Sequence, residues 1–375
     1  MITQFDDYMI HQTSDPIAQP SPSDKNFYDR YWFNGFDREA GFLFESGFAI
    51  YPNRKVMDGH WSVSIDGVQH SFHASCRAPI DRSESSVGPL HVEVLTPMRA
   101  VRIHLEPNET GIECDLRFSA RSFPHLEPKN VMHDGLRCIM NTSRFTQLGC
   151  WEGSFSVNGE RREVRAAETL GTRDKSWGVR PVGEPEVGAP GLLTSEPGVY
   201  WVWAPILWDG FCTQFGSFED RDGNPTQVSA HVVPVYANAA EIPEGEDPEI
   251  RPMASAKHKI HWRKGTRLAE RAEFQLTSQE GEVLSFSLEP MIRFQLLAIG
   301  YQHPEWGHGF WKGEEAIAAE SWNLDEIDLL DYKHIHNHQI CRAVMGDRVG
   351  IGTLETVVFG RHDPSGFTGM LDGAP

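Results

Sequence analysis

Residues 168–180 read ETLGTRDKSWGVR, and the prediction of the fold starts from this stretch of the 375-residue chain. It places Arg173, Asp174, Trp177 and Arg180 close to two glycines. The glycines disfavour a helix, and the stretch alternates too poorly for an ordinary half-buried strand. Charged groups beside a tryptophan, at the junction of two β-rich halves, are typical of a polar patch in an apolar cavity.

Two interpretations of this stretch remain open. In one, arginine and Asp174 form a buried ion pair that fastens two sheets, and Trp177 is part of the core. In the other, Asp174 is a catalytic carboxylate in an apolar cavity, and Arg173 or Arg180 orients it or holds an oxyanion. Burial would raise the pKa of Asp174 and a nearby arginine would lower it, so the sequence leaves the direction open.

Short alternating runs separated by turn residues fill the chain on both sides of this stretch. Asp66-Gly67 and Asn158-Gly159 each stand between two such runs, and both dipeptides are typical of two-residue hairpin turns. No long segment with a helical period is present, although we expect a short helix around Glu314 to Ser321. The pattern predicts an all-β chain of many antiparallel strands, which closed or nearly closed barrels would protect at their edges.

Changes in composition divide the chain into three parts. Residues 1–30 are polar and contain prolines, and they predict an N-terminal arm. We expect one β domain at 31–185 and a second at 186–375. Residues 183–198, rich in glycine and proline, predict the boundary between them or a lid loop.

The formal net charge of −19 disfavours a nucleic-acid partner and an anionic membrane surface. No stretch approaches the roughly 20 apolar residues of a membrane span, and the N-terminus does not resemble a signal peptide. The six scattered cysteines predict buried free thiols. We therefore expect a cytoplasmic protein whose partner is a hydrophobic small molecule, and a homodimer remains open.

Aromatic residues concentrate in two segments. Tyr200 to Gly210 place Tyr200 on one face of a strand and Trp201 and Trp203 on the other; this pattern fits either core packing or an aromatic wall for a ligand. Gly300 to Glu314 combine glycines with histidines and tryptophans, as loops at a binding site often do. The candidates in this second segment are His303, Trp306, His308 and Trp311.

Three alternating histidines, His334, His336 and His338, are a possible metal-binding pattern because neutral imidazole ligates zinc or iron. No acidic ligand is identifiable from the spacing, so hydrogen-bonded histidines are the simpler interpretation. A glycine-rich phosphate loop and a serine-hydrolase elbow are both absent from the sequence, which disfavours nucleotide cofactors and a serine triad.

The segment QLGCWEGSFSVNGERREVRAAETLGTRDKSWGVRP resembles the Gly-x-Trp-x-Gly … Gly-x-Arg-Asp-x-Ser-Trp-Gly-x-Arg pattern of the AttH-like, lipocalin-like superfamily, which includes the carotenoid 1,2-hydratases. The later GHGFWKGE and GDRVGIGTLE are also similar to members of this superfamily. The resemblance implies two lipocalin-like β-barrel domains packed side by side and no organic cofactor. It aligns Asp174 with the aspartate of the hydratases' Asp-His-Asn-Trp-Gly motif, and Lys175 and Ser176 with its histidine and asparagine.

Three hypotheses of function follow. The first is a cofactor-free lyase or isomerase that hydrates, dehydrates, isomerises or cyclises a terpenoid, steroid or aromatic compound. Its catalytic residues would be Asp174, Arg173 and His308, and its substrate-binding residues would be Trp177, Arg180, Tyr200, Trp201, Trp203, Trp306 and Trp311. The second is a non-catalytic carrier of the same ligands, and the third is a metal-dependent enzyme that uses the three alternating histidines.

Overall fold

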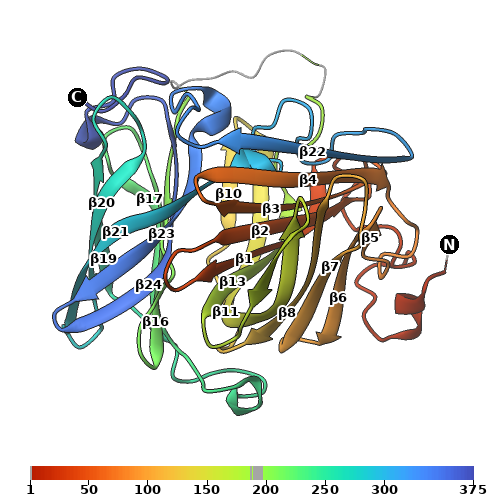
Figure 1. The fold of residues 1–375 in the computed structure, drawn as a ribbon, viewed down its shortest axis with the longest axis horizontal. Coiled ribbons are helices and arrows are strands. Elements are labelled where there is room, and N and C mark those ends of the chain that lie inside the picture. Colours follow the sequence, from red (N-terminus) through yellow and green to blue (C-terminus); the bar gives the residue numbers. More distant parts are fainter. Residues whose placement is uncertain (1, 186–187, 189–196) are drawn as a thin grey trace.

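The computed structural model describes residues 2–185, 188 and 197–375, and nearly all regular structure in these ranges is β-strand. The strands form two antiparallel sheets, called sheet A and sheet B, which lie side by side (Figure 1). This arrangement confirms the predicted all-β architecture. The predicted boundary or lid loop at 183–198 lies mostly outside the described residues.

Sheet A contains 14 strands, most of them from the first half of the chain. Its path is, in order, β22 (Glu315–Asn323), β4 (Val68–Arg77), β3 (Val56–Ile65), β2 (Leu43–Tyr51), β1 (Phe27–Asp37), β13 (Thr169–Val179), β11 (Arg137–Val157), β8 (Ile112–Ala120), β7 (Ala100–Leu105), β6 (Leu90–Thr96) and β5 (Ser86–Val87). Three further strands pair with β11, namely β9 (His125–Leu126), β10 (Asn130–Asp134) and β12 (Glu160–Val164).

Sheet B contains ten strands from the second half. Its path is β18 (Arg251–Pro252), β17 (Pro225–Pro234), β16 (Phe211–Glu219), β14 (Val199–Trp203), β24 (Arg348–Phe359), β23 (His336–Met345), β21 (Val283–Gln295), β20 (Ala269–Thr277) and β19 (Ser255–Trp262), with β15 (Ile206–Leu207) beside β16 and β24. The 3-10 helices are η1 (Gln4–Asp7), η2 (Ala239–Glu241), η3 (Leu296–Ile299), η4 (Tyr332–His334) and η5 (Asp363–Ser365). Among the described residues, no helix has the length and apolar character needed to cross a membrane.

Both predicted hairpin turns are present. Asp66 and Gly67 have φ of 51° and 78° between β3 and β4, and Asn158 and Gly159 have φ of 52° and 83° between β11 and β12. Positive φ at both central residues defines the turn type whose twist matches antiparallel strands, and Asp-Gly and Asn-Gly accept it readily.

The prediction of a short helix around Glu314 to Ser321 is wrong. Residues Glu315–Asn323 form the strand β22, which pairs with β4 along its whole length. The local sequence is helix-compatible, but the unpaired edge of β4 supplies a hydrogen-bond ladder that overrides local propensity. β22 thus lies at the end of sheet A, although its residues come from the range predicted for the second domain (Figure 1). β1 likewise begins inside the range predicted as the arm, and the division into two domains stays a prediction.

The two faces of sheet A differ in character. One face carries the apolar core, including Phe33, Phe44, Trp61, Phe118 and Trp151. The sheet curls around this core until β3 approaches the far end, where Gly59 lies against Val87 and Leu90. The opposite face of β1 to β4, β11 and β13 is polar and faces sheet B; we call it the polar face.

The opening stretch forms β13, a central strand of sheet A that pairs with β1 on one side and β11 on the other. Both faces of this strand are covered, which explains why its sequence does not alternate between polar and apolar residues. A side chain at Gly171 would collide with the backbone oxygen of Asn34 and with Trp151, whose indole donates a 2.7 Å hydrogen bond to that same oxygen. Gly178 adopts φ of 127°, which favours glycine.

A buried glutamine joins the two sheets and allows a test of this architecture. The Gln69 amide donates to the backbone oxygen of Gln295 and accepts from its backbone N–H, both at 2.9 Å. Gln69→Leu should lower the free energy of unfolding by about 2–4 kcal/mol, because it leaves two buried backbone groups unpaired. Urea unfolding measures this, with the exposed Gln275→Leu on β20 as the control, expected to stay within about 0.5 kcal/mol. An equal loss in both variants would contradict the role of this contact.

Candidate functional site

The polar face consists of rows of paired residues that run across the strands of sheet A. The row through Asp174 contains Trp32 on β1, Thr146 on β11, Gly47 on β2, His60 on β3 and His73 on β4. The next row contains Arg30, Ser176, Arg144, Ala49 and Asp58. Because directly paired residues point to the same side of a sheet, these side chains share one face.

This face is buried although it is polar. The outward residues of β3 and β4 are each at most 3% exposed, namely Asp58, His60, Ser62, Ser64, Gln69, Ser71, His73 and Ser75. The end of β21, η3 and the segment 300–313 cover them, while β23 and β24 of sheet B contact β1 and β2 on the same face. A buried polar group without a partner costs free energy, so the two sides of this interface must meet in a way that pairs these groups.

At the centre of the interface, an imidazole lies between two carboxylates. His338 of β23 contacts Glu45 of β2 at 2.7 Å through Nδ1 and Glu355 of β24 at 3.3 Å through Nε2. Burial alone would lower the pKa of His338, but the two carboxylates raise it to about 10. His338 is therefore an imidazolium at neutral pH. Its neighbour His336 bonds Glu355 at 2.7 Å, and burial lowers the pKa of His336.

Asp174 lies beside this cluster and is 8% exposed. Burial raises its pKa to about 6, against the opposing charges of Arg144 and Arg30. Its Oδ1 atom is buried without a hydrogen-bond partner among the described residues. A buried carboxyl group that titrates near neutrality and has a free oxygen is able to exchange a proton with a ligand.

An aromatic wall flanks Asp174 on the side of sheet B. The ring of Trp32 lies 5.8 Å from that of Trp203, and the guanidinium of Arg144 lies 5.5 Å and 5.6 Å from the rings of Trp201 and Trp203. Glu127 accepts from Arg144 Nε at 3.0 Å and from the indole of Trp203 at 3.3 Å. The Arg144–Glu127 ion pair therefore holds two of the predicted tryptophans close to the predicted carboxylate.

A second group on the polar face surrounds Tyr301. Arg180 donates to His308 Nδ1 at 3.2 Å, and His308 Nε2 lies 2.8 Å from the backbone oxygen of Ile299. These contacts place the His308 proton on Nε2 and leave neither ring nitrogen free. Burial lowers the pKa of His308 well below its usual value, so the ring is neutral. Tyr301 links this group to the cluster around His338, because its ring centroid lies 4.5 Å from that of His308 and 4.6 Å from that of His336.

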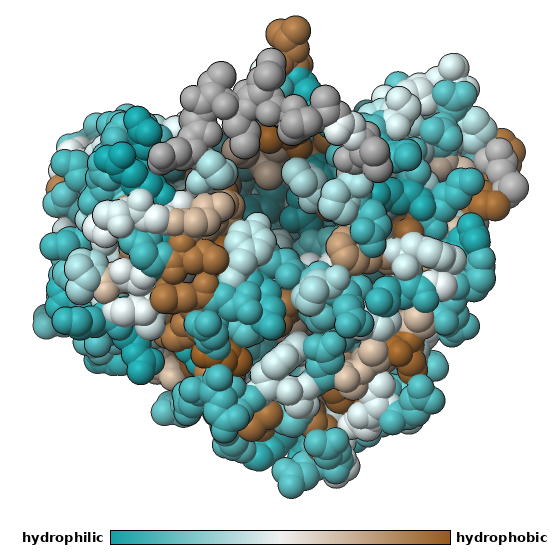
Figure 2. All heavy atoms as spheres, turned by 90° about the horizontal axis from the view of Figure 1, so that it is seen from above, coloured by the Kyte–Doolittle hydropathy of each residue, from teal (hydrophilic) through white to brown (hydrophobic). Residues whose placement is uncertain are grey.

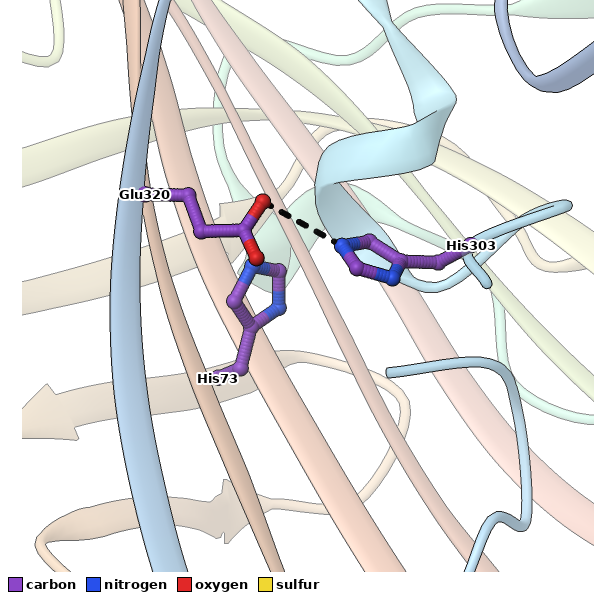
Figure 3. Close-up of side chains that lie close together, drawn as sticks. All are labelled: His73, His303 and Glu320. Carbon is purple, nitrogen blue, oxygen red and sulfur yellow. Dashed lines mark hydrogen bonds and ion pairs between the residues drawn. The ribbon is translucent and has the colours of Figure 1, made fainter. Parts of the chain in front are cut away.

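Histidines continue the polar face towards β22. His60 and His73 meet through their Nδ1 atoms at 2.9 Å, and His73 stacks on Trp306 at 5.6 Å. Figure 3 shows His73, His303 and Glu320 converging, with His303 Nε2 at 3.3 Å from Glu320. This trio and His336, His338 and Glu355 are the two described groups that are close enough to hold a metal ion.

One histidine in each group makes contacts that disfavour a metal ion, although His73 Nε2 and His336 Nδ1 have no hydrogen-bond partner among the described residues. His303 Nδ1 accepts two backbone N–H groups, at 2.9 Å and 3.1 Å, so its proton lies on Nε2, the nitrogen that faces Glu320. His338 contacts a carboxylate through each nitrogen and has no lone pair to offer as an imidazolium. His334 lies in η4, where its Nδ1 contacts the backbone oxygen of Asp328, and not with the other two histidines of the alternating set.

Four of the predicted site residues lie elsewhere. Arg173 is on the opposite face of β13 from Asp174 and donates to Gln147 at 2.8 Å. Tyr200 faces the core of sheet B, while Trp201 and Trp203 face the interface, as the alternation predicted. Trp177 and Trp311 are 38% and 45% exposed. The structure therefore places Trp201 and Trp203 near Asp174, His308 beside Arg180, and Trp306 on His73 at the far end of the polar face, and it does not bring Arg173 to Asp174.

Sequence reasoning missed most of the partners in this site, namely Arg30, Trp32, Glu45, Asp58, His60, His73, Glu127, Arg144, Tyr301 and Glu355. One signal was present in β3 and β4, whose outward positions read Asp-His-Ser-Ser and Gln-Ser-His-Ser. Such alternation is typical of a solvent-facing side, and nothing local indicates that a second sheet covers it.

Two surface clefts lie away from the polar face. One of about 620 Å³ follows β6 and β7 and is lined by residues such as Arg82, Glu93 and Arg102. Another of about 490 Å³ lies against β19 to β21. Asp174 lines neither cleft. Seen from above, the surface is hollowed near its middle, and the atoms inside the hollow are mainly hydrophilic (Figure 2). We place the candidate site at the polar face because buried titratable groups concentrate there.

A family model described as Family of unknown function (DUF8625) matches residues 2–368. Among solved structures, an AttH protein from Nitrosomonas europaea aligns with 90% of this chain and 96% of its own, at 12% identity and a TM-score of 0.53. Kievitone hydratase from Nectria haematococca aligns at 11% identity over 88% of both chains, and CghA at 10% identity over 89% of this chain and 88% of its own, both with TM-scores of 0.48. No curated protein sequence matches. The first alignment confirms the expected AttH-like fold, and the lower scores carry no argument.

The central imidazolium makes stability depend on pH in a defined direction. The pKa of His338 is raised in the folded state, so its contribution is complete below about pH 6.5 and is lost as the pH rises through about 10. His338→Gln should lower the free energy of unfolding by about 3–5 kcal/mol at pH 6, because two buried carboxylates lose their counter-ion. The loss should shrink towards pH 10, as urea titrations will show. His133→Gln on exposed β10 is the control, and a pH-independent loss would contradict this assignment.

The protonation pattern also predicts the metal content. The purified protein should contain no stoichiometric zinc or iron, and added zinc should not raise its melting temperature. Plasma emission spectrometry and thermal denaturation measure this. Stoichiometric metal that disappears in His303→Gln or His336→Gln would show that these histidines release their protons to a metal.

Proposed function

The chain belongs to this family of unknown function, and from its AttH-like fold and buried polar face we propose that it is an enzyme for hydrophobic small molecules. Its chemistry would be acid–base catalysis without an organic cofactor: hydration, dehydration, isomerisation or cyclisation of a terpenoid, steroid or aromatic compound. Asp174 is the group that gives and takes the proton.

The observation that carries this proposal is the state of Asp174. Its pKa of about 6 allows both the protonated and the ionised form near neutral pH, which a general acid or base needs. Ordinary surface carboxylates are fully ionised there and cannot donate. Its free Oδ1 lies among buried groups, where bulk water does not compete for the proton.

In the hydration reaction, the proton of Asp174 moves to one carbon of a double bond, and positive charge develops on the other carbon. The indole rings of Trp32 and Trp203 stabilise that charge through their π-faces. A water molecule adds to the cation, and its proton returns to the carboxylate of Asp174. The reverse sequence is dehydration, and loss of a different proton from the cation moves the double bond.

The Arg144–Glu127 pair is a positioning element in this scheme. Arg144 lies against Trp201 and Trp203, and Glu127 accepts from the Trp203 indole, so the pair fixes the aromatic wall relative to β13. Thr146, which pairs with Asp174 across the strands, donates to Glu127 at 2.5 Å. An aromatic wall held in a fixed position is what orientation effects in catalysis require.

Asp174→Asn tests the proposal on a panel of prenyl, steroid and phenolic alkenes and alcohols, with conversion followed by mass spectrometry. Wild type should convert at least one compound by gain or loss of water or by isomerisation. The variant should be slower by about 10²–10⁴-fold, because asparagine keeps the shape but not the proton. The wild-type pH profile should inflect near pH 6, and the variant's residual profile should not.

Glu270→Gln on the exposed side of β20 is the matched control and should keep full activity. Wild-type turnover rates in Asp174→Asn would contradict the catalytic role of Asp174. Binding of compounds by both proteins with no turnover by wild type would instead support the non-catalytic carrier.

A further inference from the structure

Two arginines on the polar face, the buried Arg30 and the half-buried Arg180, have no carboxylate bonded to them within the described ranges. Arg30 of β1 is 2% exposed; its Nη1 donates to the Tyr301 hydroxyl at 3.3 Å and its guanidinium lies 5.1 Å from that ring. Arg180 follows β13 directly and lies 4.6 Å from the ring of Tyr28 and 5.6 Å from that of Tyr301. Both cations therefore pack on aromatic faces around Tyr301.

Each guanidinium keeps a nitrogen with nothing to bond. Arg30 Nη2 and Arg180 Nε are inaccessible to solvent and have no hydrogen-bond partner among the described residues. A side chain at Gly47 would come within 2.4 Å of Arg30 Nη2, so the glycine makes room for this guanidinium. Leaving a buried cation without a counter-ion costs several kcal/mol, so the fold gains if an anion enters.

The surrounding groups do not supply that anion. Burial raises the pKa of Asp58 to about 7 in spite of both arginines, so this carboxyl is only partly ionised at neutral pH. Its oxygens already accept from the backbone of Gly309 at 2.6 Å and from the Tyr51 hydroxyl at 3.2 Å. His60 and His308 have pKa values well below the usual one and stay neutral. Asp174, one row from Arg30, adds negative charge at neutral pH, but it and the partly ionised Asp58 do not balance both arginines.

We propose that Arg30 and Arg180 bind the anionic head of a hydrophobic organic acid, a carboxylate or an ionised enol or phenol, and that this acid is the ligand of the site. A guanidinium presents its donors in a planar fork that matches a planar oxyanion. Tyr28, Tyr51 and Tyr301 surround the two cations with apolar rings, which suits a singly charged, weakly hydrated head attached to an apolar body.

The geometry also places the head relative to Asp174. Arg30 pairs with Ser176 across β1 and β13, and Asp174 is the next residue on the same face. Diagonal neighbours on a sheet lie about 7–8 Å apart. The head would thus sit one row from the proton donor, with the apolar body towards Trp32 and Trp203. The inference about where the reacting bond lies rests on the function proposed above. The inference that the two arginines bind an anion does not.

Three ligands with the same ten-carbon tail test the proposal: decanoate, decanol and decyltrimethylammonium. Titration calorimetry on the wild-type chain should give decanoate at least about tenfold tighter binding than either of the others, equivalent to about 1.4 kcal/mol. Arg30→Gln and Arg180→Gln should each weaken decanoate by about tenfold or more and leave decanol unchanged. Arg117→Gln, an exposed arginine on β8, is the matched control and should change nothing.

Equal affinity for decanoate and decanol in the wild type would overturn the proposal. This comparison needs only the wild-type chain, so it tests the anion site even if a glutamine variant does not fold. Binding of inorganic phosphate as tight as that of decanoate would also overturn it, because the site would then take free anions. Asp174→Asn should bind decanoate at least as tightly as the wild type, because it keeps both arginines and removes a neighbouring negative charge. The arginine variants and the comparison of headgroups therefore test the anion site through binding. The turnover rate of Asp174→Asn tests the proposed catalysis separately.

Discussion

The whole arrangement depends on burying charged groups between two sheets without leaving them unpaired. Glu45 of sheet A and Glu355 of sheet B meet on opposite sides of His338, so one imidazolium pairs with carboxyl groups from both sheets. Such a cluster is stable only in one relative position of the sheets, because a shift of an ångström would leave a buried charge without its partner. The polar contacts thus specify how the sheets meet, while the apolar cores on their far faces supply most of the stability.

Most polar groups at this interface are satisfied, and the exceptions are informative. Gln69 bonds the backbone of Gln295, Asn34 bonds Thr353, and Glu127 bonds Arg144, so these contacts are structurally complete. Asp174 Oδ1, Arg30 Nη2 and Arg180 Nε are buried and lack a hydrogen-bond partner among the described residues, as do His60 Nε2, His73 Nε2 and His336 Nδ1. Because proteins rarely leave buried polar atoms unpaired, such atoms on one face indicate where a ligand completes the structure. A carboxyl group and two cations in neighbouring rows suit a ligand with an acidic head and a reacting centre close to it.

Much of the fold was predictable from local chemistry. Asp66-Gly67 and Asn158-Gly159 define hairpins by their backbone preferences, and the alternation in 200–203 correctly separated Tyr200 from Trp201 and Trp203. The resemblance around Gly171 to Arg180 was confirmed at the level of fold. Asp174 was identifiable because it stands among charged groups beside a tryptophan and two glycines, and because the stretch resembles the superfamily pattern. Arg173 was a less apt candidate, since adjacent residues of a strand point to opposite faces.

The sequence by itself determined the all-β class and the hairpin turns, because these depend on neighbours within a few residues. It also identified Asp174 of the proposed site, but not the residues that surround it. Only the tertiary structure decided that the alternating polar residues of β3 and β4 face another sheet and not water, and that β22 forms a strand. It also decided which charges meet: Glu45 lies 293 positions from His338, and the pKa of each group follows from such contacts. Local patterns record which side of a strand is polar, but the environment of that side depends on distant parts of the chain.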